Sequence, residues 1–319
     1  MLFRKILTHK PFCVLLNDLE KAIRQNHLKT TRRDNSLFVR SGQFVTRIDV
    51  VPPANKERGD ASIEAVVQIK TEVPREFADD DLLSLLTKWI NAKATLGALI
   101  VEKDHYCIGS RLTIYDQDSA WNLHFGLLLF TILGTGQSFM RSTLAIIDSL
   151  QGCRTVLDNE EPSAWTTKDL SLVESYLSKI CVCTSNGLRL TSELSLANGE
   201  MSAIHGDRHT ALWQIFADQP HPEMGGGLRC LLELPHRIDD ESRVGPILNQ
   251  LNLMEMAPRD LPPHFGAWHP GNLGNNPAYV SFFPNVMHRL EGIALNASIW
   301  ALHRTEWANQ TLVSLGVQP

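Results

Sequence analysis

The residue types most capable of chemistry gather in the segment AIHGDRHTA, at residues 203–211. His205 and His209 are four residues apart, so on one face of a helix they could bind a single zinc ion, with Asp207 as a third ligand. Gly206 disfavours a helix here, and no glutamate lies between the histidines to act as a general base. We therefore expect a polar surface loop and no metal. A metal-dependent hydrolase using His205, Asp207 and His209 is the alternative function.

Two cysteines and three serines are the other candidates for reactive groups. Cys181 and Cys183 form a C-x-C pattern, whereas redox and zinc sites usually use C-x-x-C, and no second pair follows. The pattern favours structural thiols that are buried on one face of a strand. Ser119, Ser142 and Ser298 lack the G-x-S-x-G context of a hydrolase nucleophile. The sequence therefore predicts no catalytic residue and no cofactor, and the protein is not expected to be an enzyme.

A glycine-rich stretch, FGAWHPGNLGNNPAYVSFFPN at residues 265–285, could be taken for a phosphate-binding loop. Such a loop needs a helix N-terminus directly after the glycines, but the strand-like run AYVSFF follows instead. The stretch is therefore predicted to be a β-hairpin with a long turn. Trp268 ends its first strand beside a Pro-Gly turn. Two alternatives stay open for this side chain, namely core packing or an exposed anchor for a partner.

Composition limits the classes of partner. The 319-residue chain is 43% hydrophobic and 20% charged with a formal net charge of −5, as expected for a soluble globular protein. This charge argues against nucleic-acid and anionic-membrane partners. The early apolar run FCVLL is interrupted by Asn17 and Asp18, and the run at 123–133 is too short to cross a bilayer. Six irregularly spaced cysteines then favour a cytoplasmic location with reduced thiols.

The elements that would position any site occur in the same order twice. Periodicity predicts a helix, three strands, a helix, two strands and a helix at 1–149, then a linker at 150–165, and the same order again at 166–319. Corresponding segments lie 165 to 169 residues apart, as in Gly97-Ala98 and Gly266-Ala267. The fold class is therefore predicted to be α+β, with two tandem copies of an α-β-β-β-α-β-β-α domain and antiparallel sheets.

This order, together with the segment FGAW…AYVSFFPNVM, resembles the type III secretion chaperone-like fold, which includes the bacterial YbjN-like proteins. The resemblance covers residues 10–149 and 166–310 and carries no catalytic motif. It implies a small domain with a curved antiparallel sheet that often pairs as a dimer and binds other polypeptides. The chain departs from the single-domain pattern because it carries two copies.

The expected function is therefore non-enzymatic: a chaperone-like protein that binds a protein or peptide client. Candidate partner-binding residues are Trp268, Trp89 and Leu86. The two copies are expected to pair within one chain, through the helices beginning near Asp79 and Asp239, because the linker keeps them at high effective concentration. The protein is then expected to be a monomer containing an intramolecular pseudo-dimer.

Overall fold

The computed structural model describes residues 12–42, 44–51, 63–73, 87, 90–102, 105–115, 125–150, 161–196, 210–257, 261–271 and 275–319. The chain divides into two compact units, neither of which is continuous in sequence. Unit 1 comprises Met1–Leu83, Leu96–Arg154 and Asn252–Phe265. Unit 2 comprises Ser84–Thr95, Thr155–Leu251 and Gly266–Pro319.

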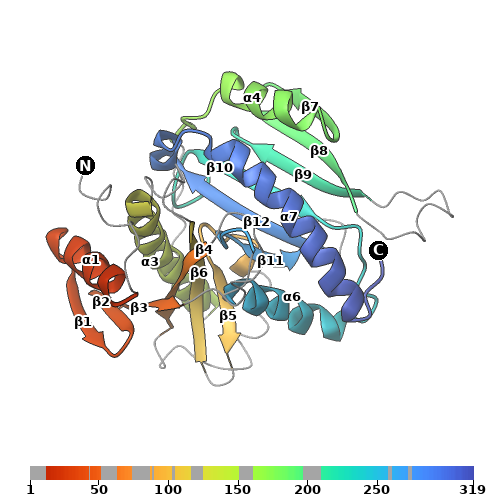
Figure 1. Cartoon of the computed structure of the whole chain (residues 1–319). Coiled ribbons are helices and arrows are strands. Elements are labelled where there is room, and N and C mark those ends of the chain that lie inside the picture. The colour runs from red at the N-terminus through yellow and green to blue at the C-terminus, as the bar shows by residue number, and fades with distance from the viewer. Residues whose placement is uncertain are drawn as a thin grey trace. The chain divides into compact units, whose positions relative to one another are not determined.

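Unit 1 is built on a six-stranded antiparallel sheet with the strand order β1-β2-β3-β4-β6-β5 (Figure 1). Its elements are α1 (Phe12–Gln25), β1 (Lys29–Arg33), β2 (Ser36–Ser41), β3 (Phe44–Val51), β4 (Ile63–Glu72), β5 (Ala98–Glu102), β6 (His105–Tyr115) and α3 (Phe125–Leu150).

The core of unit 1 lies between one face of this sheet and the helices α1 and α3. Alternation along β3 and β4 turns Ile48 and Ile69 toward this face, where they pair across the strands and are buried. Leu19 and Ile23, four residues apart on α1, are fully buried, and α1 contacts β1, β2 and β3. The opposite face carries a cross-strand row of polar residues, which positions the network described below.

Unit 2 has a second six-stranded antiparallel sheet, with the order β11-β12-β10-β9-β8-β7. Its elements are α4 (Thr167–Leu177), β7 (Val182–Asn186), β8 (Arg189–Ser195), β9 (Thr210–Phe216), β10 (Gly227–Glu233), α6 (Glu241–Met256), β11 (Ala267–Pro270), β12 (Pro277–Pro284), the 3-10 helix η4 (Asn285–Arg289) and α7 (Ile293–Ser314). The boundary between the two units falls within α6, at Leu251 and Asn252.

Helices α4 and α7 cover one face of the second sheet. Helix α7 contacts β9 and β10, and α4 contacts β7 and β8. Trp213 of β9 is buried on this face, and its indole Nε1 donates a hydrogen bond to the Ser298 hydroxyl of α7 at 3.1 Å. This bond satisfies the one polar atom of a large buried side chain, so it fixes α7 against the strand.

The two sheets have the same strand order, with β1 to β6 corresponding to β7 to β12 in sequence. The first hairpin of each sheet also has the same turn. Two residues connect β1 to β2 and β7 to β8, and the first of them, Asp34 or Gly187, has a φ of 51° or 61°. Such a positive φ at the first turn position matches the right-handed twist of the flanking strands. The repeated topology agrees with the repetition of elements in the sequence.

The α+β class and the antiparallel sheets are thus as predicted, but the predicted number of strands is wrong. Each sheet has six strands, not five, because β1 and β7 each add an edge strand. The helix predicted from Asp79 lies almost entirely outside the described residues, although Ile90 and Asn91 are helical. In the described part of the chain, no helix combines the length and apolarity needed to cross a membrane.

Candidate functional site

Helix α4 is the first element of the candidate site, and its N-terminus is held firmly. The Asp169 carboxylate accepts the Thr166 backbone N–H and the Thr166 hydroxyl, both at 2.8 Å, and lies 3.3 Å from His288 Nε2. Partial burial opposes ionisation, yet these hydrogen bonds and His288 lower the pKa of Asp169 below its ordinary value. Leu170, Val173 and Leu177 then bury one helix face against the unit. Helix α4 is therefore a rigid platform.

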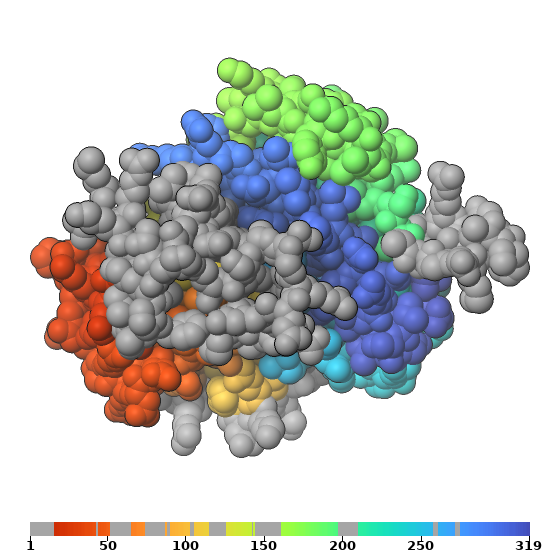
Figure 2. All heavy atoms as spheres, in the orientation of Figure 1, coloured from red at the N-terminus to blue at the C-terminus, as the bar shows by residue number. Residues whose placement is uncertain are grey.

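The outer face of α4 carries apolar side chains where polar ones would be expected. Leu172 is 64% exposed and Tyr176 is 41% exposed, and they are followed by Ile180 at 59% and Val182 at 64%. The first three residues are spaced by four, so they follow one line along the helix and into the turn before β7. We call Leu172, Tyr176, Ile180 and Val182 the α4–β7 strip. Figure 2 shows this segment, in green, at the molecular surface.

Strand β7 extends this strip with a free sheet edge. It lies at the end of the strand order, and within the described part of the chain it pairs only with β8. Because a two-residue turn joins the strands, Asn186 and Arg189 form a hydrogen-bonded pair, and alternation turns the N–H and C=O groups of Cys183 and Ser185 outward. Natural edge strands are usually protected by charges or proline, and VCTSN has neither. Among the described residues, no other strand pairs with this edge, so its outward groups can accept an added strand.

Two thiols, those of Cys181 and Cys183, lie beside the strip, and each makes one hydrogen bond. Cys181 Sγ donates to the Leu177 carbonyl at 3.3 Å, and Cys183 Sγ accepts from the Ser192 hydroxyl at 3.1 Å. Both cysteines are partly exposed, not buried as the sequence predicted, because Cys183 is on an edge strand and Cys181 is in the turn before it. Burial raises the pKa of Cys181, and the neighbouring Cys183 raises it further. A raised pKa leaves the thiol protonated and a poor nucleophile.

Of the predicted partner-binding residues, only Trp268 lies among the described residues. Trp268 is fully buried. Of the two alternatives predicted for its side chain, the structure therefore shows core packing, and the prediction of an exposed partner anchor is wrong. The reason is its register: Trp268 pairs with Tyr279, and its ring lies 5.3 Å from the Tyr279 ring and 6.5 Å from Trp307 of α7. Trp89 and Leu86 lie outside the described residues, so their role stays a prediction.

The predicted alternative metal site, formed by His205, Asp207 and His209, also lies outside the described residues. Among the described residues, no group of three or more histidine, cysteine, aspartate or glutamate side chains could hold a metal ion. Of three further histidines that lie near prolines in the sequence, His264 belongs to unit 1, whereas His221 and His269 belong to unit 2.

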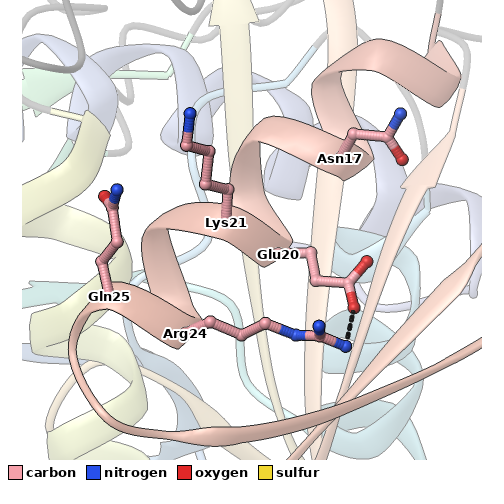
Figure 3. Close-up of a pocket in the computed structure, with 5 residues that line it drawn as sticks. All are labelled: Asn17, Glu20, Lys21, Arg24 and Gln25. Atoms are coloured by element: carbon pink, nitrogen blue, oxygen red, sulfur yellow. Dashed lines mark ion pairs between the residues drawn. The ribbon is translucent and has the colours of Figure 1, made fainter.

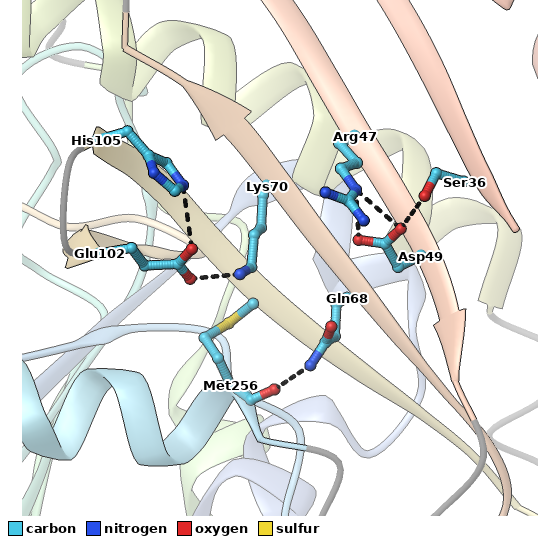
Figure 4. A network of polar contacts seen from close by, with 8 residues as sticks. All are labelled: Ser36, Arg47, Asp49, Gln68, Lys70, Glu102, His105 and Met256. Atoms are coloured by element: carbon cyan, nitrogen blue, oxygen red, sulfur yellow. Dashed lines mark hydrogen bonds and ion pairs between the residues drawn. The ribbon is translucent and has the colours of Figure 1, made fainter. Parts of the chain in front are cut away.

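Unit 1 carries a polar network on the sheet face that lies opposite α1 (Figure 4). Asp49 accepts hydrogen bonds from Ser36 at 2.5 Å and from Arg47 at 2.9 Å. Glu102 bonds to Lys70 and lies 3.1 Å from His105 Nε2. Gln68 Nε2 donates to the Met256 carbonyl at 2.6 Å, which holds the 252–265 segment on this face. These contacts join Arg47 to Asp49 within β3, and Glu102 of β5 to His105 of β6 and Lys70 of β4. They therefore stabilise the sheet.

A shallow hollow of about 470 Å³ lies along α1, lined by Asn17, Glu20, Lys21, Arg24 and Gln25 (Figure 3). Within it, the Arg24 guanidinium lies 2.6 Å from the Glu20 carboxylate, and Arg24 Nε also donates to the Thr30 hydroxyl at 2.6 Å. All five side chains come from one helix, so the hollow lacks the converging walls of a small-molecule site.

Sequence reasoning missed all four residues of the α4–β7 strip. One signal was present: in TKDLSLVESYLSKI, the apolar positions 170, 172, 173, 176 and 177 cover more of the helix than one buried stripe requires. Leu172 and Tyr176 are the two apolar residues that the buried stripe does not require. The edge strand β7 gave no signal, because VCTSN lacks apolar alternation.

Among the described cysteines, Cys107 and Cys230 are fully buried. The two buried thiols are unsuited to nucleophilic attack, since burial raises the pKa of Cys107 to about 12 and also raises that of Cys230. Comparison of the chain with protein-family models, curated proteins and solved structures gave no significant match.

Proposed function

We propose that the protein is a non-enzymatic polypeptide-binding protein that takes an extended apolar client segment along the α4–β7 strip. One observation carries the proposal: three exposed apolar side chains, Leu172, Tyr176 and Ile180, lie in a row, and the exposed Val182 then begins a sheet edge that has neither charge nor proline. Large exposed apolar surface is rare on soluble proteins and marks interaction sites. An added strand would bond to the outward backbone groups of Cys183 and Ser185, while its side chains cover the strip.

Lys168 and Lys179 flank the strip, and both are exposed. The strip itself is uncharged, so charge does not select the bound segment. A client is recognised instead by its extended backbone and by alternate apolar side chains, which is the general mode of strand addition. Such recognition is tolerant of sequence and suits a chaperone-like role.

The finer topology that we propose for each unit is the secretion-chaperone-like fold. Its support is the repeated strand order of the two antiparallel sheets, with a helix before and a helix after the six strands of each copy, and helix α6 between β10 and β11 of the second. Each unit has one edge strand more than this expectation, β1 in unit 1 and β7 in unit 2. The cytoplasmic location and the protein or peptide client remain part of the same proposal.

An intramolecular pseudo-dimer is the arrangement proposed for the two copies. It is supported by the composition of the units, because residues 84–95 of the first copy belong to unit 2 and residues 252–265 of the second belong to unit 1. In unit 2, Phe282 N–H donates to the Thr95 carbonyl at 3.1 Å. In unit 1, His264 and Arg111 exchange two backbone hydrogen bonds of 2.9 and 3.1 Å. Light scattering should then give the monomer mass of 35.7 kDa. A stable dimer of twice this mass would contradict it.

The client-binding proposal is tested with a fluorescent octapeptide that alternates valine and threonine and carries a short polyethylene glycol tail. Its anisotropy should rise on titration with the full-length protein. Leu172→Gln/Tyr176→Gln should weaken binding about thirtyfold, since burial of their exposed parts contributes about 1 kcal/mol each. The matched control is Val313→Gln, which removes an equally apolar, 42% exposed side chain from α7. Equal affinity for the double variant and the wild type would refute the proposal.

A further inference from the structure

Strand β1 is the free edge of the other sheet, and its chemistry is the opposite of β7. Its sequence is KTTRR, and four of its five residues are exposed. Within the described part of the chain it pairs only with β2. The two-residue turn makes Arg33 and Ser36 a hydrogen-bonded pair, so alternation turns the backbone N–H and C=O groups of Thr30 and Arg32 outward.

The side chains around this edge are predominantly cationic. Between residues 12 and 51 there are seven lysines and arginines against four acidic residues, although the whole chain has a net charge of −5. Lys29 pairs across the strands with Arg40, so these two cations share a sheet face with Arg33. None of the three makes an ion pair with another residue that the structure describes, and the Arg33 guanidinium lies 5.5 Å from the Phe38 ring.

On the α1 side, the other cations of the edge are already engaged. Arg32 donates to the Asn17 side chain. Arg24 forms an ion pair with Glu20 (Figure 3) and donates to the Thr30 hydroxyl. These bonds fix β1 against α1. On β1 and β2, the cations that remain for an incoming group are therefore Lys29, Arg33 and Arg40, which share one sheet face. Figure 2 shows the segment from α1 to β3, in red and orange, at the surface.

We propose that β1 binds an acidic, extended polypeptide segment as a seventh strand of the unit 1 sheet. Alternate carboxylates on such a strand would lie opposite Lys29 and Arg33, where opposite charges stabilise a cross-strand pair. A second copy of this chain does not fit, because antiparallel self-pairing would set lysine and arginine against each other. A nucleic acid could use the charges, but it could not pair with the outward backbone groups of a strand. This site is separate from the α4–β7 strip and uses unit 1 residues alone.

The test is fluorescence anisotropy of full-length protein with an octapeptide that alternates glutamate and threonine. Binding is expected to weaken as salt is added, because the cations are exposed. Lys29→Glu/Arg33→Glu should lower the affinity at least tenfold. Its matched control, Arg237→Glu/Arg289→Glu, makes the same charge change at exposed unit 2 positions and should bind like the wild type. Equal loss in both double variants would overturn the proposal, since only the net charge would then matter.

Two further probes separate strand addition from simple charge attraction. The same acidic peptide with N-methyl groups on alternate amides keeps its carboxylates but cannot pair along the edge, and it should bind at least tenfold more weakly. A single-stranded oligonucleotide of matched charge should bind more weakly than the unmodified peptide. Equal binding by the N-methylated peptide, or tighter binding by the oligonucleotide, would overturn the proposal. A lack of binding by the acidic peptide would also overturn the proposal. The charges of β1 would then serve only to prevent edge-to-edge association.

Discussion

A buried histidine should make unit 2 sensitive to mild acid. His269 of β11 is 6% exposed, and its Nδ1 lies 2.7 Å from the Pro270 carbonyl. Because a carbonyl only accepts, Nδ1 carries the proton, and Nε2 is buried without a hydrogen bond to any described residue. Burial, assisted by the nearby Arg229, lowers the pKa of His269 from 6.5 to about 4, against the opposing effect of the Pro270 bond. The perturbation to study is His269→Asn, which keeps a donor for Pro270.

The direction of the effect follows from proton binding. Between pH 6.5 and about 4, the unfolded chain binds a proton at this position and the folded chain does not, so stability falls as the pH falls. The stabilising contribution is complete above pH 6.5 and is lost on approach to pH 4. A pKa change from 6.5 to about 4 corresponds to about 3 kcal/mol of unfolding free energy.

The assay is denaturant unfolding between pH 4 and 7.5, followed by tryptophan fluorescence. The wild type should lose about 3 kcal/mol more than His269→Asn over this range, whatever the variant costs at pH 7.5. Other titrating groups, including the half-buried His221, contribute equally to both proteins and cancel. His303→Asn, at an exposed position on α7, is the control and should keep the wild-type slope. The reasoning is refuted if His269→Asn and the wild type have parallel pH profiles.

Three further outcomes are expected. Gly266→Ala should destabilise unit 2 by at least about 2 kcal/mol, because its Cβ would lie 2.1 Å from the Val280 carbonyl oxygen. Gly134→Ala should instead stabilise α3 by about 1 kcal/mol in denaturant unfolding, since a Cβ there meets nothing within 4 Å; equal signs for the two glycines would contradict one of the two assignments. Asp169→Ala should cost about 1 kcal/mol at pH 7, and the difference should vanish as acid protonates the carboxylate in the wild type through its lowered pKa; a constant difference would count against the cap.

The sequence predicted the covered parts of the sheets better than their edges. Strands such as β3, with a burial pattern that alternates over much of its length, have one face in the core, and this produces a readable period. The edge strands KTTRR and VCTSN are exposed on both faces, so no buried face requires apolar and polar residues to alternate along them. Both were therefore missed, and with them both proposed docking edges.

The prediction of an exposed anchor at Trp268 failed for a related reason. Trp268 stands beside Pro270 and Gly271 in sequence, which suggests a surface turn. Its burial depends on Trp307, which lies 39 positions later in the chain, and no local pattern contains that information. Likewise, the assignment of residues 84–95 and 252–265 to units other than those of their neighbours depends on tertiary packing alone.

Amide hydrogen exchange of β7 tests the central claim most directly. When the neutral valine–threonine peptide is bound, the outward N–H groups of Cys183 and Ser185 should exchange more slowly. The slowing should increase with the fraction of the protein that carries bound peptide. The inward N–H groups of Thr184 and Asn186 already bond to β8 and should change less. Protection confined to other elements, with Cys183 and Ser185 unchanged at saturating peptide, would contradict the account.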